Sequence, residues 1–68
     1  MTTHTTKVTV GQLAEGDIIR MNSRAPKRRV WMLGTQGIHA TLGTEALDGT
    51  ARSILDTTTA KRVLREAQ

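Results

Sequence analysis

Residues 28–42 read RRVWMLGTQGIHATL and decide the fold class. Residues 28–33, RRVWML, predict a strand that places Val30 and Met32 on one face and Arg29, Trp31 and Leu33 on the other. The segment 34–37, GTQG, predicts a hairpin connection, because both of its glycines can adopt a positive φ. Polar and apolar residues alternate over 38–42, which predicts the returning strand. In this returning strand the residues predicted to face the core are Ile38, Ala40 and Leu42.

Further strands are predicted on the N-terminal side of this hairpin. Residues 1–6, MTTHTT, offer little to anchor in a core, and we expect a flexible tail there. Residues 7–10, KVTV, alternate and are rich in β-branched side chains, which predicts a strand. Leu13 is expected to enter the core from the next loop, and Gly16-Asp17 predicts a turn into a strand over 17–21. Ile19 and Met21 share one face of that strand, and Ile18 and Arg20 share the other.

The connections around the central hairpin have clear turn signals. Residues 22–27, NSRAPK, predict a loop, and Pro26 lacks the backbone donor that a central strand needs. Asp48-Gly49 is a strong hairpin dipeptide and predicts a strand over 50–55. The stretch 43–47 can continue the strand before it after a bulge.

The C-terminal end leaves two alternatives open. Asp56 can cap a helix over 60–67, a segment of good helix formers. Alternatively, 56–59 forms a turn and 61–65 closes the sheet with Val63 facing inward. The run of three threonines and the need to complete a sheet favour the strand.

Short strands separated by turn signals at intervals of about 8–12 residues indicate an all-β meander. The 68 residues make one small domain, expected over 7–66. A barrel of five or six strands removes unpaired strand edges, and it is the predicted architecture. The alternative is an open antiparallel sheet with a C-terminal helix.

The pattern Val8-x-Val10-x-x-Leu13-x-x-Gly16-Asp17-x-Ile19 resembles the opening of many SH3-like small barrels. There a short strand and a Leu-bearing turn lead through Gly-Asp into the second strand. Three further segments are similar to short basic proteins common in actinobacteria and their phages, namely 29–30, 48–52 and 56–57 ahead of Val63. The resemblance spans 7–66 and implies an SH3-like barrel, a fold that serves nucleic-acid, peptide and assembly roles alike.

Composition excludes several classes of chemistry. Without cysteine the chain has no disulfide framework, Cys-based zinc site or thiol nucleophile. No apolar run reaches the length of a membrane span and no signal peptide is recognisable, so we expect a cytoplasmic protein. His4 and His39 lack neighbouring ligands, and Ser23 and Ser53 lack an adjacent base. We therefore assign no catalytic residue, metal, cofactor or small-molecule substrate, and do not expect an enzyme.

Positive charge is concentrated in one window of the sequence. The formal net charge is +4, yet residues 18–44 contain no Asp or Glu and contribute +5. Residues 1–17 contribute −1, and residues 45–68 contribute zero. Five cations gathered at one end of a sheet would repel one another, and a polyanion would relieve that repulsion. The predicted phosphate contacts are Arg20, Arg24, Lys27, Arg28 and Arg29.

Trp31, the only aromatic residue among Phe, Trp and Tyr, leaves two alternatives open. It shares a predicted face with Arg29 and Leu33, where it could stack on an unpaired base beside the cations. A single Trp in so small a domain is more often the largest core residue. Because the sequence has no Phe or Tyr, we expect contacts with the nucleic-acid backbone and weak base specificity.

Two function hypotheses follow. The first is a small nucleic-acid-binding regulatory or accessory protein of bacterial or phage origin, whose site includes Trp31 beside the five cations. The second is a protein–protein interaction module, including a homo-oligomer or a phage-encoded ligand of a host protein. In that case an exposed strand edge, or the face of Ile18, Trp31 and Leu33, would dock the partner.

Overall fold

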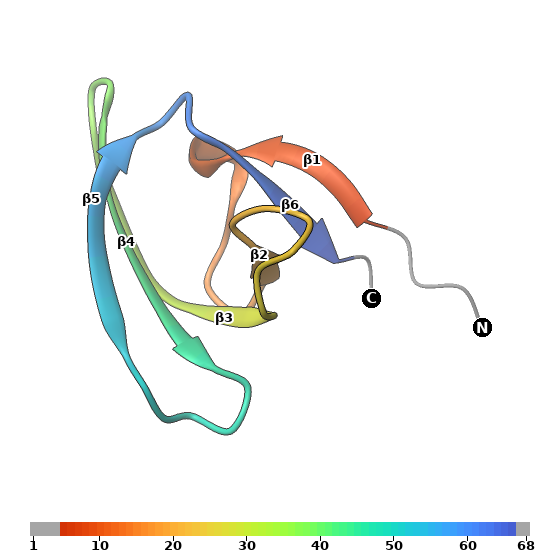
Figure 1. The fold of residues 1–68 in the computed structure, drawn as a ribbon. Coiled ribbons are helices and arrows are strands. Elements are labelled where there is room, and N and C mark those ends of the chain that lie inside the picture. Colours follow the sequence, from red (N-terminus) through yellow and green to blue (C-terminus); the bar gives the residue numbers. More distant parts are fainter. Residues whose placement is uncertain (1–4, 67–68) are drawn as a thin grey trace.

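The protein, a computed structural model that describes residues 5–66, is a single antiparallel sheet of six strands with one short 3-10 helix (Figure 1). Along the chain the elements are β1 (Thr5–Thr9), η1 (Val10–Gln12), β2 (Ile18–Arg20), β3 (Arg28–Gln36), β4 (His39–Ala46), β5 (Ser53–Thr58) and β6 (Arg62–Glu66). Across the sheet the strand order is β1-β6-β2-β3-β4-β5. The all-β prediction is confirmed.

The sheet curls but does not close into the predicted barrel. β6 pairs with β1 on one side and β2 on the other, so β5 has no second partner strand within residues 5–66. The two edge strands are therefore β1 and β5. Figure 1 shows β4 and β5 facing β1 and β6 across the interior.

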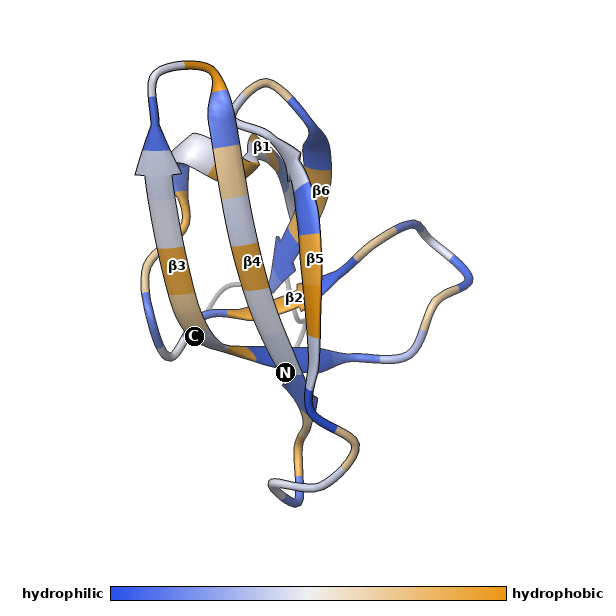
Figure 2. Ribbon diagram, turned by 90° about the vertical axis from the view of Figure 1, so that its left-hand side faces the viewer, coloured by the Kyte–Doolittle hydropathy of each residue, from blue (hydrophilic) through white to orange (hydrophobic). Residues whose placement is uncertain are grey.

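The hydrophobic core lies on the concave side of the curled sheet. Apolar and polar segments alternate along β3, β4 and β5 (Figure 2), as expected for a sheet with one buried face. Leu13 enters this core from the loop after η1, as predicted, and Ile19 lies in it from β2. The buried apolar residues are Val8, Val10, Leu13, Ile19, Val30, Ala40, Leu42 and Val63.

A β-bulge in β3 changes which residues face the core. The pairing register shifts between Val30 and Met32, so Trp31 is an extra residue on this strand. Beyond the bulge the alternation is inverted, and Leu33 lies opposite Leu42 and packs against the core. The prediction that Met32 shares a face with Val30 is wrong for this reason.

The turn between β3 and β4 is tighter than predicted. Gln36 pairs with His39, so Gly37 and Ile38 alone form the connection, and Gly37 has a φ of +60°. The prediction that Ile38 faces the core is wrong, because it lies in the turn and is 70% exposed.

Both ends of the described chain are strands that pair with each other. β1 begins at Thr5, two residues before the predicted start, because Thr5 and Thr6 lie opposite Glu66 and Arg65. The rest of the predicted tail, residues 1–4, lies outside the described residues.

At the C-terminal end the strand alternative is confirmed, since β6 occupies the segment for which a helix was the other possibility. The predicted turn over 56–59 is shorter than expected, because β5 continues through Thr58 before the chain reverses. Within residues 5–66, no helix is long and apolar enough to cross a membrane.

Candidate functional site

Arg28, one of the five predicted phosphate contacts, is bonded inside the fold. Its Nε donates to Oγ1 of Thr44 at 2.9 Å, and its Nη2 donates to the carbonyl oxygen of Thr44 at 3.2 Å. Nη2 also donates to the carbonyl oxygen of Ala51. The planar guanidinium thus joins β3 to β4 and to the loop before β5 through three of its five N–H donors.

Arg29 faces a buried carboxylate. Glu45 on β4 is only 6% exposed, and its Oε2 lies 3.6 Å from Nη1 of Arg29. Oε1 of Glu45 accepts a hydrogen bond from Nε of Arg52 at 3.0 Å. A buried carboxylate requires such partners, so the charge of Arg29 is compensated within the protein.

Trp31 packs on the sheet rather than in the core. An added Cβ at Gly43 would lie 2.8 Å from Cε2 of the indole, so the ring rests directly on that glycine. Its Nε1 donates to the carbonyl oxygen of Thr44 at 3.2 Å. The guanidinium of Arg52 lies 4.9 Å from the ring centroid. The half-buried indole is therefore in contact with Arg52. One hypothesis from the sequence was that this ring stacks on an unpaired base.

Arg20 is also paired within the fold. Its Nε donates to Oε1 of Glu66 at 3.1 Å, and Glu66 is 8% exposed. The predicted gathering of five free cations at one tip therefore does not occur, because Glu45 and Glu66 reach two of the arginines from the C-terminal third of the chain. The three predicted cations with partners inside the fold are Arg20, Arg28 and Arg29.

Arg24 and Lys27 remain exposed in the loop between β2 and β3. Oδ1 of Asn22 accepts a hydrogen bond from the backbone nitrogen of Arg24 at 2.9 Å and shapes this loop. Within residues 5–66 neither cation has a carboxylate partner. These two predicted residues are available to an external anion.

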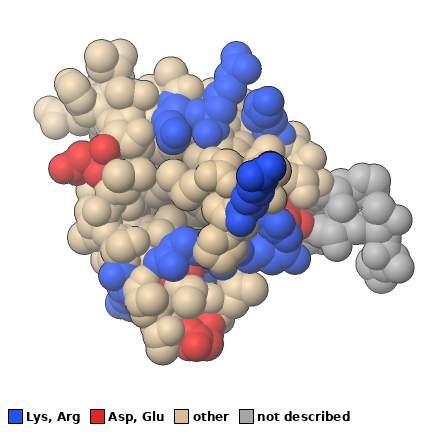
Figure 3. Space-filling model, viewed as in Figure 1, with Lys and Arg blue, Asp and Glu red and all other residues tan. Residues whose placement is uncertain are grey.

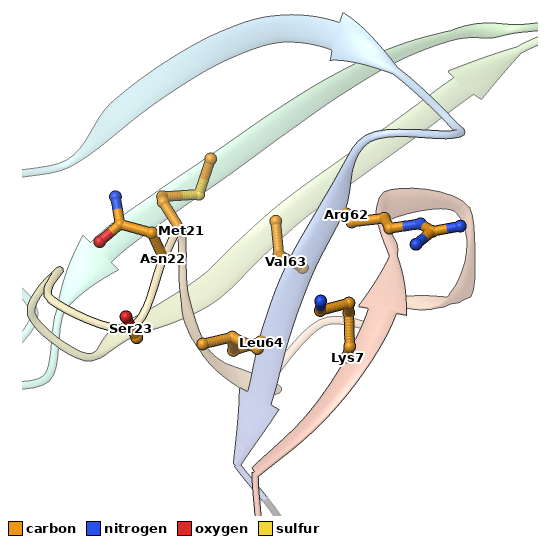
Figure 4. A pocket seen from close by; sticks show the side chains of 7 residues that line it. All are labelled: Lys7, Met21, Asn22, Ser23, Arg62, Val63 and Leu64. Carbon is orange, nitrogen blue, oxygen red and sulfur yellow. The ribbon is translucent and has the colours of Figure 1, made fainter.

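A hollow of about 370 Å³ opens beside this loop (Figure 4). Its walls come from β1, β6 and the residues after β2, and they are Lys7, Met21, Asn22, Ser23, Arg62, Val63 and Leu64. A second hollow adjoins it past Ser23 and Leu64 and reaches Lys27. A third adjoins it past Lys7 and Arg62 and reaches Gln12. We call this continuous depression the basic groove.

Strand register explains why cations distant in sequence meet in the basic groove. Lys7 on β1 lies opposite Leu64 on β6, and Leu64 lies opposite Arg20 on β2. Directly opposite residues of antiparallel strands point to the same side of a sheet, so these three form a row. Arg62 is two residues before Leu64 and points to the same side.

Five cations that have no carboxylate partner in residues 5–66 lie on or beside the basic groove. The sequence analysis missed three of them. Lys7, Lys27 and Arg62 line the groove, while Arg24 and Lys61 are chain neighbours of lining residues. Figure 3 shows Lys and Arg side chains around the hollowed middle of this face. The acidic residue in the lining is Glu66, which is already paired with Arg20. Lys7, Lys61 and Arg62 were missed because their segments carry no net positive charge.

The fold and the groove together define a small open-sheet β-protein with a basic surface depression. No protein-family model, curated protein or solved structure matches the chain. The resemblance to SH3-like small barrels therefore stays a prediction, and the basic groove is the feature that points to a function.

Proposed function

We propose that the protein binds nucleic acid through phosphate contacts in the basic groove. The observation that supports this proposal is the separation of the charges. Arginines of the central hairpin have partners inside the fold, whereas cations from β1, β6 and the β2–β3 loop converge without carboxylate partners in the described residues. Like charges that lie close together without carboxylate partners favour an anionic ligand.

The shape of the groove favours a polyanion over a single small anion. The cations are distributed over three adjoining hollows rather than focused on one point. A chain of phosphates can contact cations spaced in this way, and each contact releases counterions. The central hollow has an apolar floor of Met21, Val63 and Leu64, which can contact a sugar or a base without reading its identity.

Salt dependence of affinity is the direct test. Five phosphate contacts predict a slope of log K against log salt of about −4.5 on duplex DNA, a loss of several hundredfold between about 50 and 200 mM salt. Fluorescence anisotropy with labelled duplex and single-stranded oligonucleotides measures this slope. Affinity that does not change with salt would contradict the phosphate model.

A matched pair of variants separates the groove from net charge. Lys7→Gln with Arg62→Gln removes two groove cations and should reduce the slope to about −2.7 on duplex DNA. The control, Gln36→Glu with Ile38→Glu, lowers the net charge equally at the exposed β3–β4 hairpin and should change binding much less. Equal losses in both double variants would mean that overall charge, and not the groove, controls affinity.

Charge reversal at Arg28 and Arg29 is unsuitable as a test of binding. Both side chains hold β3 to β4 and the following loop, so their reversal should destabilise the fold itself. Arg24→Gln with Lys27→Gln avoids this difficulty, because both residues are exposed in a loop.

A further inference from the structure

The two edge strands of the sheet differ in their protection against further pairing. β1 carries Lys7, a charged residue of the kind that discourages edge-to-edge association. β5 has the sequence SILDTT, without Lys or Pro, and it presents Ile54 at 59% and Leu55 at 43% exposure. An exposed apolar edge of this kind favours the addition of another strand.

The sequence around Ile54 is complementary to itself in the antiparallel orientation. A two-fold axis perpendicular to the sheet keeps every residue on its own face, so opposite residues must share a face. With the axis at Ile54, this side chain meets Ile54 of the second copy. On the same face, Arg52 then lies opposite Asp56 of the second copy, and this ion pair occurs twice.

The neighbouring registers are less favourable. With the axis at Leu55, Ile54 would lie opposite Asp56 of the second copy and lose its apolar neighbour. With the axis at Asp56, two carboxylates would face each other directly, which is destabilising. Apolar matching and charge matching therefore select the same register.

Arg52 is held in a suitable position for this contact. Its Nε is bonded to Glu45 at 3.0 Å and its guanidinium stacks on Trp31, yet the side chain is 61% exposed. Within residues 5–66 its two Nη atoms have no hydrogen-bond partner. Asp56 accepts from Thr41 through Oδ1 at 3.4 Å, and its Oδ2 has no partner in the described residues.

We propose that two copies of this chain associate through β5, antiparallel and with the two-fold axis at Ile54. A domain of this size buries a limited fraction of its surface, so joining two sheets into one would add stability that the small core lacks. The basic groove lies on β1, β6 and the loop after β2, at the other end of the strand order. The pairing uses none of the residues that line the basic groove, and it does not depend on nucleic-acid binding.

Sedimentation velocity over a range of protein concentrations tests the proposal by charge exchange. Asp56→Arg alone, and Arg52→Asp alone, place like charges opposite each other and should each weaken the dimer about tenfold or more. An equimolar mixture of the two variants pairs opposite charges again and should restore a heterodimer. Restoration on mixing is not expected from any other surface.

Arg52→Asp can fail to fold, because Arg52 also contacts Glu45. A second pair of variants then tests the β5 interface. Ile54→Lys places two cations at the axis and should yield a monomer. Leu47→Lys, at an equally apolar and 45% exposed position in the β4–β5 turn, should leave the dimer intact. The proposal is overturned if the wild-type protein is monomeric at about 1 mM, or if the Ile54→Lys variant still dimerises.

Discussion

Replacing Gly43 with Ala adds a methyl group where the indole of Trp31 rests on the sheet. The new Cβ would lie 2.8 Å from Cε2, 3.0 Å from Cζ2 and 3.1 Å from Nε1 of that ring. Gly43 is buried in β4, which is paired on both sides by β3 and β5, so its backbone has little freedom to move. The ring must therefore shift outward.

The cost of this shift can be estimated from the contacts that the ring makes. Losing the 3.2 Å hydrogen bond from Nε1 to Thr44 costs about 1 kcal/mol, and losing the Arg52 contact costs about 0.5–1 kcal/mol. Residual overpacking adds about 1 kcal/mol, and the lower unfolded-state entropy of Ala returns about 0.5–1 kcal/mol. We expect a net destabilisation of about 2 kcal/mol, or a Tm lower by about 8–16 °C.

Intrinsic fluorescence makes the assay specific to this contact. Trp31 is the only Trp and the chain has no Tyr, so emission reports the environment of one ring. Thermal unfolding followed by circular dichroism gives the loss of stability. The emission maximum of the folded variant should move to longer wavelength as the ring becomes more exposed.

A double-mutant cycle tests the stated cause. In a Trp31→Ala background the added methyl group meets no ring, so Gly43→Ala should be neutral or slightly stabilising. If Gly43→Ala costs the same in both backgrounds, the contact with Trp31 is not the cause and the reasoning is refuted.

Three further predictions concern polar contacts and backbone conformation near β5. Glu45→Gln weakens the contacts with two half-exposed guanidinium groups and should lower the free energy of unfolding by about 1–2 kcal/mol, measured by urea denaturation. Ala51→Gly should raise the Tm slightly, because Ala51 has a φ of +54°; a lower Tm would count against this. Hydrogen bonds from the Thr50 hydroxyl and backbone hold the pKa of Asp48 below its ordinary value, so Thr50→Val should raise that pKa in a carboxyl NMR titration. The stabilising contribution of Asp48 is present above the unfolded-state pKa and is lost as the pH falls through the folded-state value, so the two proteins should converge in strong acid.

The local alternation of the sequence predicted most of the core. Ala40, Leu42 and Val63 are buried as expected, because each lies in a strand whose partner strands do not disturb its alternation. The bulge at Trp31 could not be predicted in the same way. It depends on the fit of the indole to a glycine on the neighbouring strand, and this is a contact between residues distant in sequence.

The candidate site was predicted less well than the fold, for a related reason. The excess of positive charge does lie in residues 18–44. It did not reveal that Glu45 and Glu66 would pair with arginines of that segment across the sheet. The basic groove depends on the pairing of β1 with β6, which brings Lys7 beside Arg62 although they are far apart in the chain. A sum of charges along the sequence does not contain either pairing.

Arginine and lysine side chains differ in their partners within this protein, and the difference follows from their chemistry. Within residues 5–66 the lysines have no carboxylate partner, whereas five of the seven arginines in the sequence are bonded to carboxylates, hydroxyls or carbonyl oxygens of the fold. A planar guanidinium can satisfy several acceptors on neighbouring strands at once, which an ammonium group does less well. With eight buried apolar residues the core is small, so such bonds across β3, β4 and β5 supply cohesion that packing alone does not. In this chain the adjacent Arg28 and Arg29 therefore bond neighbouring strands to one another, whereas Lys7, Lys27 and Lys61 are exposed.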